Sequence, residues 1–223
     1  MIYIGIATYD GKIHQTTVGG LFNVGYGLGK ARTPVCLDVI PHDPFIGHAR
    51  DLMAHRFLQI PDATDLVMID ADVGFGFSEF ESLMKIDADV VCGAYRYKED
   101  RKRYPVAPMQ PLERKGNLLK LAFGPGGFMR IRRKVLEKIA ETAPKYVDDA
   151  HGEMVQFFPF GPQNGYWKGE DANFYMLARN AGFDCWLLQG LELKHTGEKT
   201  YTGAFSLGDE GSIVGVETDL KVA

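Results

Sequence analysis

The most constraining feature of this sequence is a short, uninterrupted apolar run, Leu66-Val67-Met68-Ile69, that ends at Asp70-Ala71-Asp72. A run that is apolar at every position, rather than at every second one, is typical of a strand buried on both faces, as in the middle of a parallel sheet. The run therefore predicts a central strand with two carboxylates just beyond its C-terminal end.

Strand and helix patterns alternate along the rest of the first half. Strands are expected over 2–7, 35–40 and 89–95, and helices over 45–59 and 78–86. Ser78 is the expected N-cap of the second helix, with Glu81 three residues on completing a capping box. Strand, helix, strand, helix and strand in this order favour a parallel α/β sheet.

The second half is less regular. The sequence predicts strands over 118–123, 128–131 and 184–188, helices over 134–141 and 170–181, and a loop over 124–127. Gly182 is well placed as the C-terminal cap of the last helix. The expected fold class is α/β: a mixed, mainly parallel, Rossmann-like sheet flanked by helices, in a single domain.

The chain has 223 residues, 45% of them hydrophobic, which suits one sizeable core. We expect residues 1–195 to form the domain proper and residues 196–223 a C-terminal tail or flap of the same domain. The start of the chain has no basic stretch or long apolar region, and no stretch approaches the ~20 apolar residues of a membrane span. Cys36, Cys92 and Cys185 are far apart in apolar runs, which predicts buried free thiols and a cytoplasmic protein.

Charge is distributed unevenly, although the net charge is only −4. Residues 95–134 carry 12 Lys/Arg and 3 Asp/Glu, a balance of +9, and the remainder carries 13 Lys/Arg and 26 Asp/Glu, a balance of −13. Two interpretations stay open: ordinary surface cations on loops, or a positive face for an anionic ligand or acceptor.

Asp70 and Asp72 are the first candidates for chemistry. Ligands of open α/β sheets bind at the carboxyl ends of strands. Mg²⁺ and Mn²⁺ prefer oxygen ligands, usually one or two carboxylates together with substrate phosphates. A bare D-x-D also occurs often by chance, so the buried strand before it carries much of the argument.

Three other places are chemically suggestive. Glu170 and Asp171 begin a helix, where acidic residues either cap the helix or supply a general base. His195 follows an expected strand end and is either structural or a metal ligand. Arg50 lies near the start of a helix, either solvated or bonded to a phosphate or carboxylate. The glycines of 124–127 allow close approach of a ligand or form a plain hairpin turn.

Taken in order, these elements resemble the GT-A nucleotide-sugar glycosyltransferases, particularly the short, soluble, family-2-like members found in phage and viral genomes. The resemblance rests on Ile4-Gly5-Ile6-Ala7-Thr8-Tyr9, Ala49-Arg50-Asp51, the run ending in Asp70-Ala71-Asp72, Gly124-Pro125-Gly126-Gly127-Phe128, Gly169-Glu170-Asp171 and His195. These motifs span nearly the whole chain, and each is short, so their joint order is the specific signal.

The resemblance implies a role for each of these positions. Asp70, Asp72 and His195 would bind Mn²⁺ or Mg²⁺, and Asp70 would also contact the donor. Thr8, Tyr9 and Asp10 would line the nucleotide pocket, Arg50 would lie near the nucleotide or diphosphate, and Gly126 and Gly127 near the donor sugar. Asp171, with Glu170 beside it, would be the catalytic base of an inverting transfer.

The function expected from the resemblance is a metal-dependent hexosyl- or pentosyltransferase that uses a nucleotide-diphosphate sugar, with a UDP-sugar as the expected donor. Its acceptor could be a glycan, a lipid-linked sugar, a protein or a modified DNA base; a phage-encoded enzyme would act in the host cytoplasm. The alternatives are a Mg²⁺-dependent nucleotidyltransferase and a non-catalytic nucleotide-sugar binder. The stretch Thr8-Tyr9-Asp10-Gly11-Lys12 is short for the phosphate loop of a nucleotidyltransferase.

Overall fold

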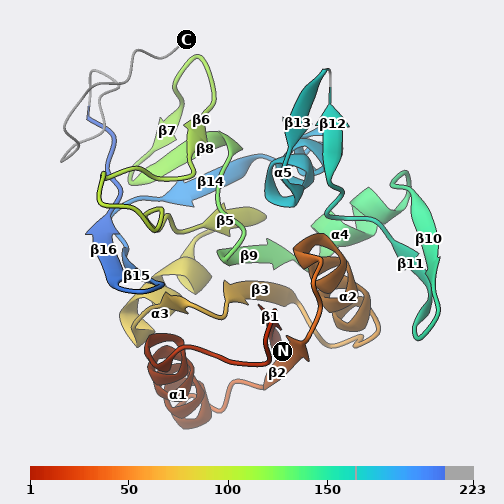
Figure 1. Ribbon diagram of the computed structural model, residues 1–223, viewed down its shortest axis with the longest axis horizontal. Helices are drawn as coiled ribbons and strands as arrows, with labels where there is room; N and C mark the ends of the chain where they lie inside the picture. Colours follow the sequence, from red (N-terminus) through yellow and green to blue (C-terminus); the bar gives the residue numbers. More distant parts are fainter. Residues whose placement is uncertain (164, 209–223) are drawn as a thin grey trace.

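The computed structural model describes residues 1–163 and 165–208 (Figure 1). One large mixed sheet forms its centre, in the order β2-β1-β3-β9-β5-β14-β8-β6, with β7 also on β8. Its strands are β1 (Ile2–Thr8), β2 (Val35–Pro41), β3 (Asp65–Asp70), β5 (Val90–Cys92), β6 (Ala107–Pro108), β7 (Arg114–Lys115), β8 (Leu118–Phe123), β9 (Phe128–Arg132) and β14 (Cys185–Leu188).

The direction of the strands brings one set of C-terminal ends together. β2, β1 and β3 are parallel neighbours, β5 and β14 are parallel to each other, and β9 lies antiparallel between β3 and β5. β1, β2, β3, β5 and β14 therefore all point the same way. The expected fold class, a mixed and mainly parallel α/β sheet flanked by helices in one domain, is confirmed.

Helices cover both faces of the sheet (Figure 1). They are α1 (Gln15–Lys30), α2 (Ile46–Leu58), α3 (Phe77–Lys85), α4 (Arg133–Ala140) and α5 (Glu170–Asn180). Alternate residues of β3 enter two separate cores: Leu66 and Met68 pack with residues of α2, α4 and α5, whereas Val67 and Ile69 pack with residues of α1 and α3. This explains why the run is apolar at every position. None of the helices in the described residues is long and apolar enough to cross a membrane.

Three small sheets complete the described chain. They are the ribbon β16-β15-β4, with β15 (Glu192–Thr196), β16 (Thr200–Ala204) and β4 (Val73–Gly74), the hairpin of β10 (Lys145–Asp148) and β11 (Gly152–Val155), and the hairpin of β12 (Gly161–Gln163) and β13 (Tyr166–Lys168). The segment expected as a tail or flap begins at the end of β15, includes β16 and buries Phe205 and Leu207; its residues 209–223 lie outside the described part.

Helix α1 is the element that the sequence pattern does not predict. It contains five glycines, each of which costs roughly 1 kcal/mol in a helix relative to alanine. Two of them serve packing: a Cβ at Gly20 would lie 2.7 Å from the Phe75 carbonyl oxygen, and one at Gly27 would overlap the Phe77 ring. Close approach to β4 and α3 therefore requires glycine there.

One local expectation is wrong, and one of two open interpretations is excluded. Helix α3 begins at Phe77 with Gly76 as N-cap, whose N–H donates to Glu79 Oε2 at 3.0 Å, so Ser78 and Glu81 do not form the cap. Gly124–Gly127 is not a hairpin turn either, because β8 pairs with β14 while β9 lies between β3 and β5. The three cysteines are free as expected, but Cys36 is only half-buried because β2 is an edge strand.

Candidate functional site

A cleft of about 820 Å³ opens at the C-terminal ends of β1 and β3. It is lined by Ala7, Thr8, Tyr9, Asp10, Lys12, Ile13, His14, Gln15, Ile46, Arg50, Asp70, Ala71, Asp72, Tyr95, Glu170, Asp171 and His195. Nine of the eleven residues expected at the site are among these. The two that are not, Gly126 and Gly127, lie behind the cleft wall.

A buried chain of polar groups forms that wall. Arg50, only 3% exposed, donates from Nη1 to Glu170 Oε1 at 2.6 Å and from Nη2 to Asp70 Oδ1 at 3.0 Å. The Tyr95 hydroxyl donates to the other Asp70 oxygen, Oδ2, at 2.9 Å and accepts the Gly127 N–H at 3.2 Å. Both oxygens of Asp70 are thus bonded to the protein.

Burial and neighbouring charges determine the pKa values of these hydrogen-bonded groups. Burial alone would lower the pKa of Arg50, but the Asp70 and Glu170 carboxylates outweigh that effect and raise it. Burial raises the pKa of Glu170 against the opposing effect of Arg50, and burial together with Asp70 raises the pKa of Tyr95 well above its usual value. Arg50 therefore stays charged and Tyr95 stays a hydrogen-bond donor at neutral pH.

The absence of side chains at Gly126 and Gly127 leaves space for Arg50 and Asp70. A Cβ at Gly126 would lie 2.5 Å from Arg50 Nη1, and one at Gly127 would overlap the Asp70 carboxylate. Neither position can hold a larger residue while Arg50 and Asp70 keep their places. Proximity of the two glycines to a donor sugar stays a prediction.

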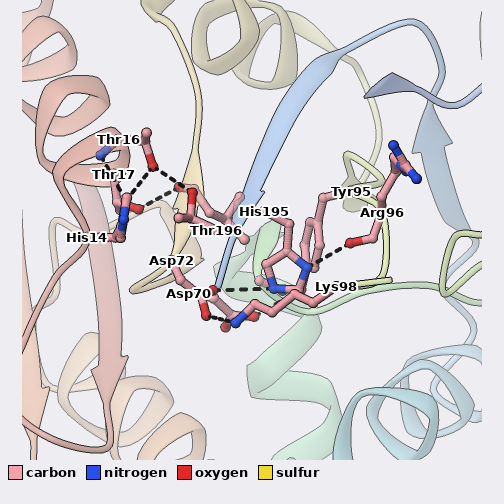
Figure 2. Close-up of polar contacts among 12 residues, drawn as sticks. His14, Thr16, Thr17, Asp70, Asp72, Tyr95, Arg96, Lys98, His195 and Thr196 are labelled. Carbon is pink, nitrogen blue, oxygen red and sulfur yellow. Dashed lines mark hydrogen bonds and ion pairs between the residues drawn. The ribbon is translucent and has the colours of Figure 1, made fainter. Parts of the chain in front are cut away.

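Asp72 and His195 meet at the other side of the cleft (Figure 2). The β15–β4 pairing sets His195 opposite Val73, and the Thr196 N–H donates to the Asp72 carbonyl oxygen at 2.9 Å. His195 Nε2 lies 3.4 Å from Asp72 Oδ1, and its Nδ1 lies 2.7 Å from the Arg96 carbonyl oxygen. Because a carbonyl only accepts, Nδ1 carries a proton, and Nε2 is the ring nitrogen that faces Asp72. Nε2 donates to Asp72 when it is protonated and would bind an ion through its lone pair when it is not.

This pair fits a divalent cation. Two atoms that each bond one ion at ~2.1 Å lie at most about 4.2 Å apart, and 3.4 Å satisfies that limit. A histidine whose second nitrogen is held by a carbonyl is the usual arrangement of a metal-binding histidine. Burial would raise the pKa of Asp72, but hydrogen bonds from His195 and Lys98 outweigh it and hold the pKa below its usual range, so Asp72 is ionised.

The expected set of three metal ligands is not assembled. Within residues 1–163 and 165–208 no three His, Cys, Asp or Glu side chains are arranged to hold an ion together. Asp70 instead bonds Arg50 and Tyr95. Asp72 and His195 remain as a pair, and two protein ligands would suit an ion that substrate phosphates and water complete.

Glu170 and Asp171 differ sharply although they are adjacent. Glu170 is buried and ion-paired with Arg50, so it is committed to the structure. Asp171 is partly exposed and lines the cleft, and its Oδ1 accepts the Ala172 N–H at 2.8 Å. Both carboxylates line the cleft, and Asp171 is the more exposed of the two.

The loop between β1 and α1 forms the remaining wall. Tyr9 is 78% exposed, Asp10 is bonded to Lys12, and the buried Thr8 hydroxyl has no hydrogen-bond partner in the described structure. His14 Nδ1 accepts the Thr16 N–H at 3.3 Å, so the proton of its neutral ring is on Nε2. His14 thereby offers a donor that sequence reasoning missed, because α1 was not expected.

Formal charge in the cleft is strongly negative. The lining holds five carboxylates and two fixed cations, Lys12 and Arg50, a balance of −3 with neutral histidines. A dianionic diphosphate would be repelled from such a site unless further positive charge enters with it.

The basic segment does not form one uncompensated positive face. At least seven of its twelve cations pair with carboxylates, namely Lys98, Arg103, Lys120, Arg130, Arg132, Arg133 and Lys134. Arg103 pairs with Glu99 of the same segment, which the balance of +9 already counts. The other six cations pair with carboxylates outside the segment, so much of the excess positive charge is neutralised within the fold. This weakens the case for a polyanionic acceptor.

Comparison with known proteins identifies the fold. No protein-family model matches the sequence, and no curated protein does either. Among solved structures, A197 from STIV matches over 100% of this chain and 96% of its own, with a TM-score of 0.57 and 18% identity. The two chains share their fold from end to end.

Weaker likenesses lie among glycosyltransferases. The catalytic domain of Drosophila beta1,4galactosyltransferase 7 matches over 85% of this chain and 65% of its own, with a TM-score of 0.47 and 14% identity. GalNAc-T7, solved with UDP, GalNAc and Mn²⁺, matches over 84% of this chain and 42% of its own, with a TM-score of 0.49 and 11% identity. This chain spans less than two thirds of the length of either structure.

Proposed function

We propose that this chain is a metal-dependent glycosyltransferase that moves a sugar from a nucleotide-diphosphate sugar to an acceptor hydroxyl. One observation carries the proposal: Asp72 Oδ1 and His195 Nε2 lie 3.4 Å apart in the cleft at the end of β3, with the ring held by the Arg96 carbonyl. The GT-A resemblance of the sequence supports the same function.

Donor binding follows from the charge of the cleft. Asp72 and His195 would hold Mn²⁺ or Mg²⁺, which supplies the positive charge that neutralises the diphosphate as it leaves. Tyr9 is exposed beside Thr8 and Asp10 at the end of β1, where its ring offers a surface for a nucleotide base. The His14 Nε2–H is a neutral donor for a phosphate or ribose oxygen.

The transfer step uses Asp171. The acceptor oxygen attacks the anomeric carbon, the bond from that carbon to the phosphate oxygen breaks, and Asp171 takes the acceptor proton. The nucleoside diphosphate departs with the electron pair of the broken bond. Direct attack from the face opposite the leaving group inverts the anomeric centre. Glu170 and Arg50 position the start of α5, and with it Asp171, against the Asp70 side of the cleft.

A thermal-shift screen tests the donor site. UDP-, GDP-, CMP- and dTDP-sugars are compared with and without Mn²⁺, on the wild type, Asp72→Asn, and the control Asp62→Asn at the opposite end of β3. A ligand at 100 times its Kd stabilises by about 2.7 kcal/mol, roughly 5–10 °C for a chain of this size. The proposal expects a Mn²⁺-dependent shift for one nucleotide, kept in Asp62→Asn and lost in Asp72→Asn.

The alternative chemistry is tested with the same protein. Release of pyrophosphate from a nucleoside triphosphate and a sugar 1-phosphate would identify a nucleotidyltransferase instead. Binding of a donor without transfer to any glycan, lipid-linked sugar, protein or modified DNA, and without slow hydrolysis of the donor, would identify a binding protein.

A further inference from the structure

Lys98 is a cation of the site that the proposed function does not use. It lies in the loop between β5 and β6, and its Nζ donates to Asp72 Oδ2, on the carboxylate whose other oxygen faces His195 (Figure 2). The Lys98 and Asp72 side chains are 38% and 34% exposed. The ammonium therefore contacts a residue that lines the cleft, and its side chain is partly open to solvent.

The backbone around Lys98 is held in place. The Arg96 carbonyl bonds His195, and the Arg96 guanidinium donates to the Asp100 carbonyl at 2.9 Å and the Thr202 carbonyl at 3.3 Å. Gly197 leaves room for the Lys98 stem, since a Cβ there would lie 3.0 Å from Lys98 Cδ. A fixed Cα with a long, half-exposed side chain lets the ammonium move by several ångströms without moving the loop.

Two electrostatic effects act on the Lys98 ammonium. A divalent cation bound by Asp72 would repel Lys98, because like charges in contact with one carboxylate are unfavourable. The diphosphate, entering a cleft with a formal balance of −3, needs more positive charge than one divalent ion provides. A lysine displaced from Asp72 would remain next to the phosphates.

We propose that Lys98 exchanges partners during the binding cycle: it neutralises Asp72 in the ion-free protein and pairs with the donor diphosphate once the ion is bound. The ion half of this inference depends only on Asp72, His195 and Lys98, whereas the donor half rests on the proposed function. Lys98 then makes ion binding and diphosphate binding cooperative. The bound ion displaces Lys98 from Asp72, and the bound diphosphate stabilises the displaced Lys98, so each ligand strengthens binding of the other.

The test compares the wild type with Lys98→Met, which keeps an apolar stem against Gly197 and removes the charge. Lys102→Met, an exposed lysine of the same loop, is the control. Electron paramagnetic resonance measures the Kd of Mn²⁺ alone, and calorimetry measures the Kd of UDP, or of the nucleoside diphosphate selected by the thermal-shift screen, at saturating Mn²⁺. Circular dichroism confirms that all three proteins are folded.

The two affinities should move in opposite directions. Lys98→Met is expected to bind Mn²⁺ alone roughly tenfold more tightly and the nucleoside diphosphate roughly tenfold more weakly, as for one charged hydrogen bond lost or gained. Lys102→Met should change neither affinity by more than about twofold.

Each other outcome is decisive. An unchanged Mn²⁺ affinity in folded Lys98→Met overturns the ion half, and tighter Mn²⁺ binding with unchanged nucleotide affinity overturns the donor half. Absence of nucleotide binding in the wild type would contradict the proposed function, while the measurement with Mn²⁺ alone would still decide whether Lys98 competes for Asp72.

Discussion

Replacing Arg50 by methionine tests whether the buried chain of charges holds the site together. Arg50 is 3% exposed and bonds two carboxylates that otherwise face each other. Removing one partner of a buried ion pair costs about 3–5 kcal/mol because the remaining charges lose their compensation. For a domain of this size, Arg50→Met is expected to lower Tm by about 6–20 °C.

The matched control is Arg56→Met. Arg56 belongs to the same helix and pairs with Asp38 at 3.0 Å, but its side chain is 37% exposed. An exposed ion pair contributes about 0.2–1 kcal/mol, so this variant should lose at most about 4 °C. Unfolding followed by circular dichroism in urea and by heating measures both variants.

The pH dependence gives a second criterion. Burial already raises the pKa of Glu170 against the effect of Arg50, so the pKa rises further once the guanidinium is gone. A carboxyl whose folded pKa exceeds its unfolded value favours the folded state at low pH, and that stability is lost as pH rises through the folded pKa. The loss of folding stability caused by Arg50→Met should thus be smaller at pH 5 than at pH 8. Adding Glu170→Gln to that variant should recover part of the lost stability. Equal costs for Arg50→Met and Arg56→Met, or a deficit that does not change with pH, would refute this reasoning.

Three further predictions concern the rest of the chain. Burial raises the pKa of Asp51 to about 7, so the wild type should lose stability relative to Asp51→Asn as pH rises from about 4 to 7, measured as Tm across that range. Gly25→Ala, with no atom near its Cβ, should raise the free energy of unfolding by about 0.5–1 kcal/mol, whereas Gly20→Ala should lower it because of the Phe75 carbonyl; urea titration separates them. Asp171→Asn should reduce transfer by at least about 100-fold while nucleotide affinity changes less than threefold, as measured by turnover and calorimetry; equal losses of both would contradict its role as base.

The parts of the fold that could be predicted are those with a local signal. The run before Asp70, the helix with Arg50 and the helix starting at Glu170 are each encoded by their own periodicity, and the structure contains all three. Helix α1 has no such signal, because its glycines oppose a helix locally and are required only by packing on Phe75 and Phe77. Its absence from the sequence prediction also hid His14.

Most of the residues that line the cleft could be named from the sequence, but the contacts among them could not. Asp72 and His195 are 123 positions apart, and their meeting depends on the β15–β4 pairing, which no local pattern reveals. The assignment of Arg50 to the donor did not foresee that its two terminal nitrogens, Nη1 and Nη2, are bonded to carboxylates of the protein. Tyr95 could have been found, because it ends a predicted strand at the edge where ligands bind. Lys98 could not, because it lies in an irregular loop.

The most direct test of the central claim measures how Mn²⁺ and a nucleoside diphosphate affect each other's binding. Calorimetric titration of UDP, GDP, CDP and dTDP into the wild type, Asp72→Asn and His195→Gln, with and without Mn²⁺, gives this coupling. If Asp72 and His195 share the ion that carries the diphosphate, Mn²⁺ tightens binding of one nucleotide at least about tenfold in the wild type, or 1.4 kcal/mol, and the coupling disappears in both folded variants. Equal nucleotide affinity with and without Mn²⁺, or the same coupling in all three proteins, would contradict the claim.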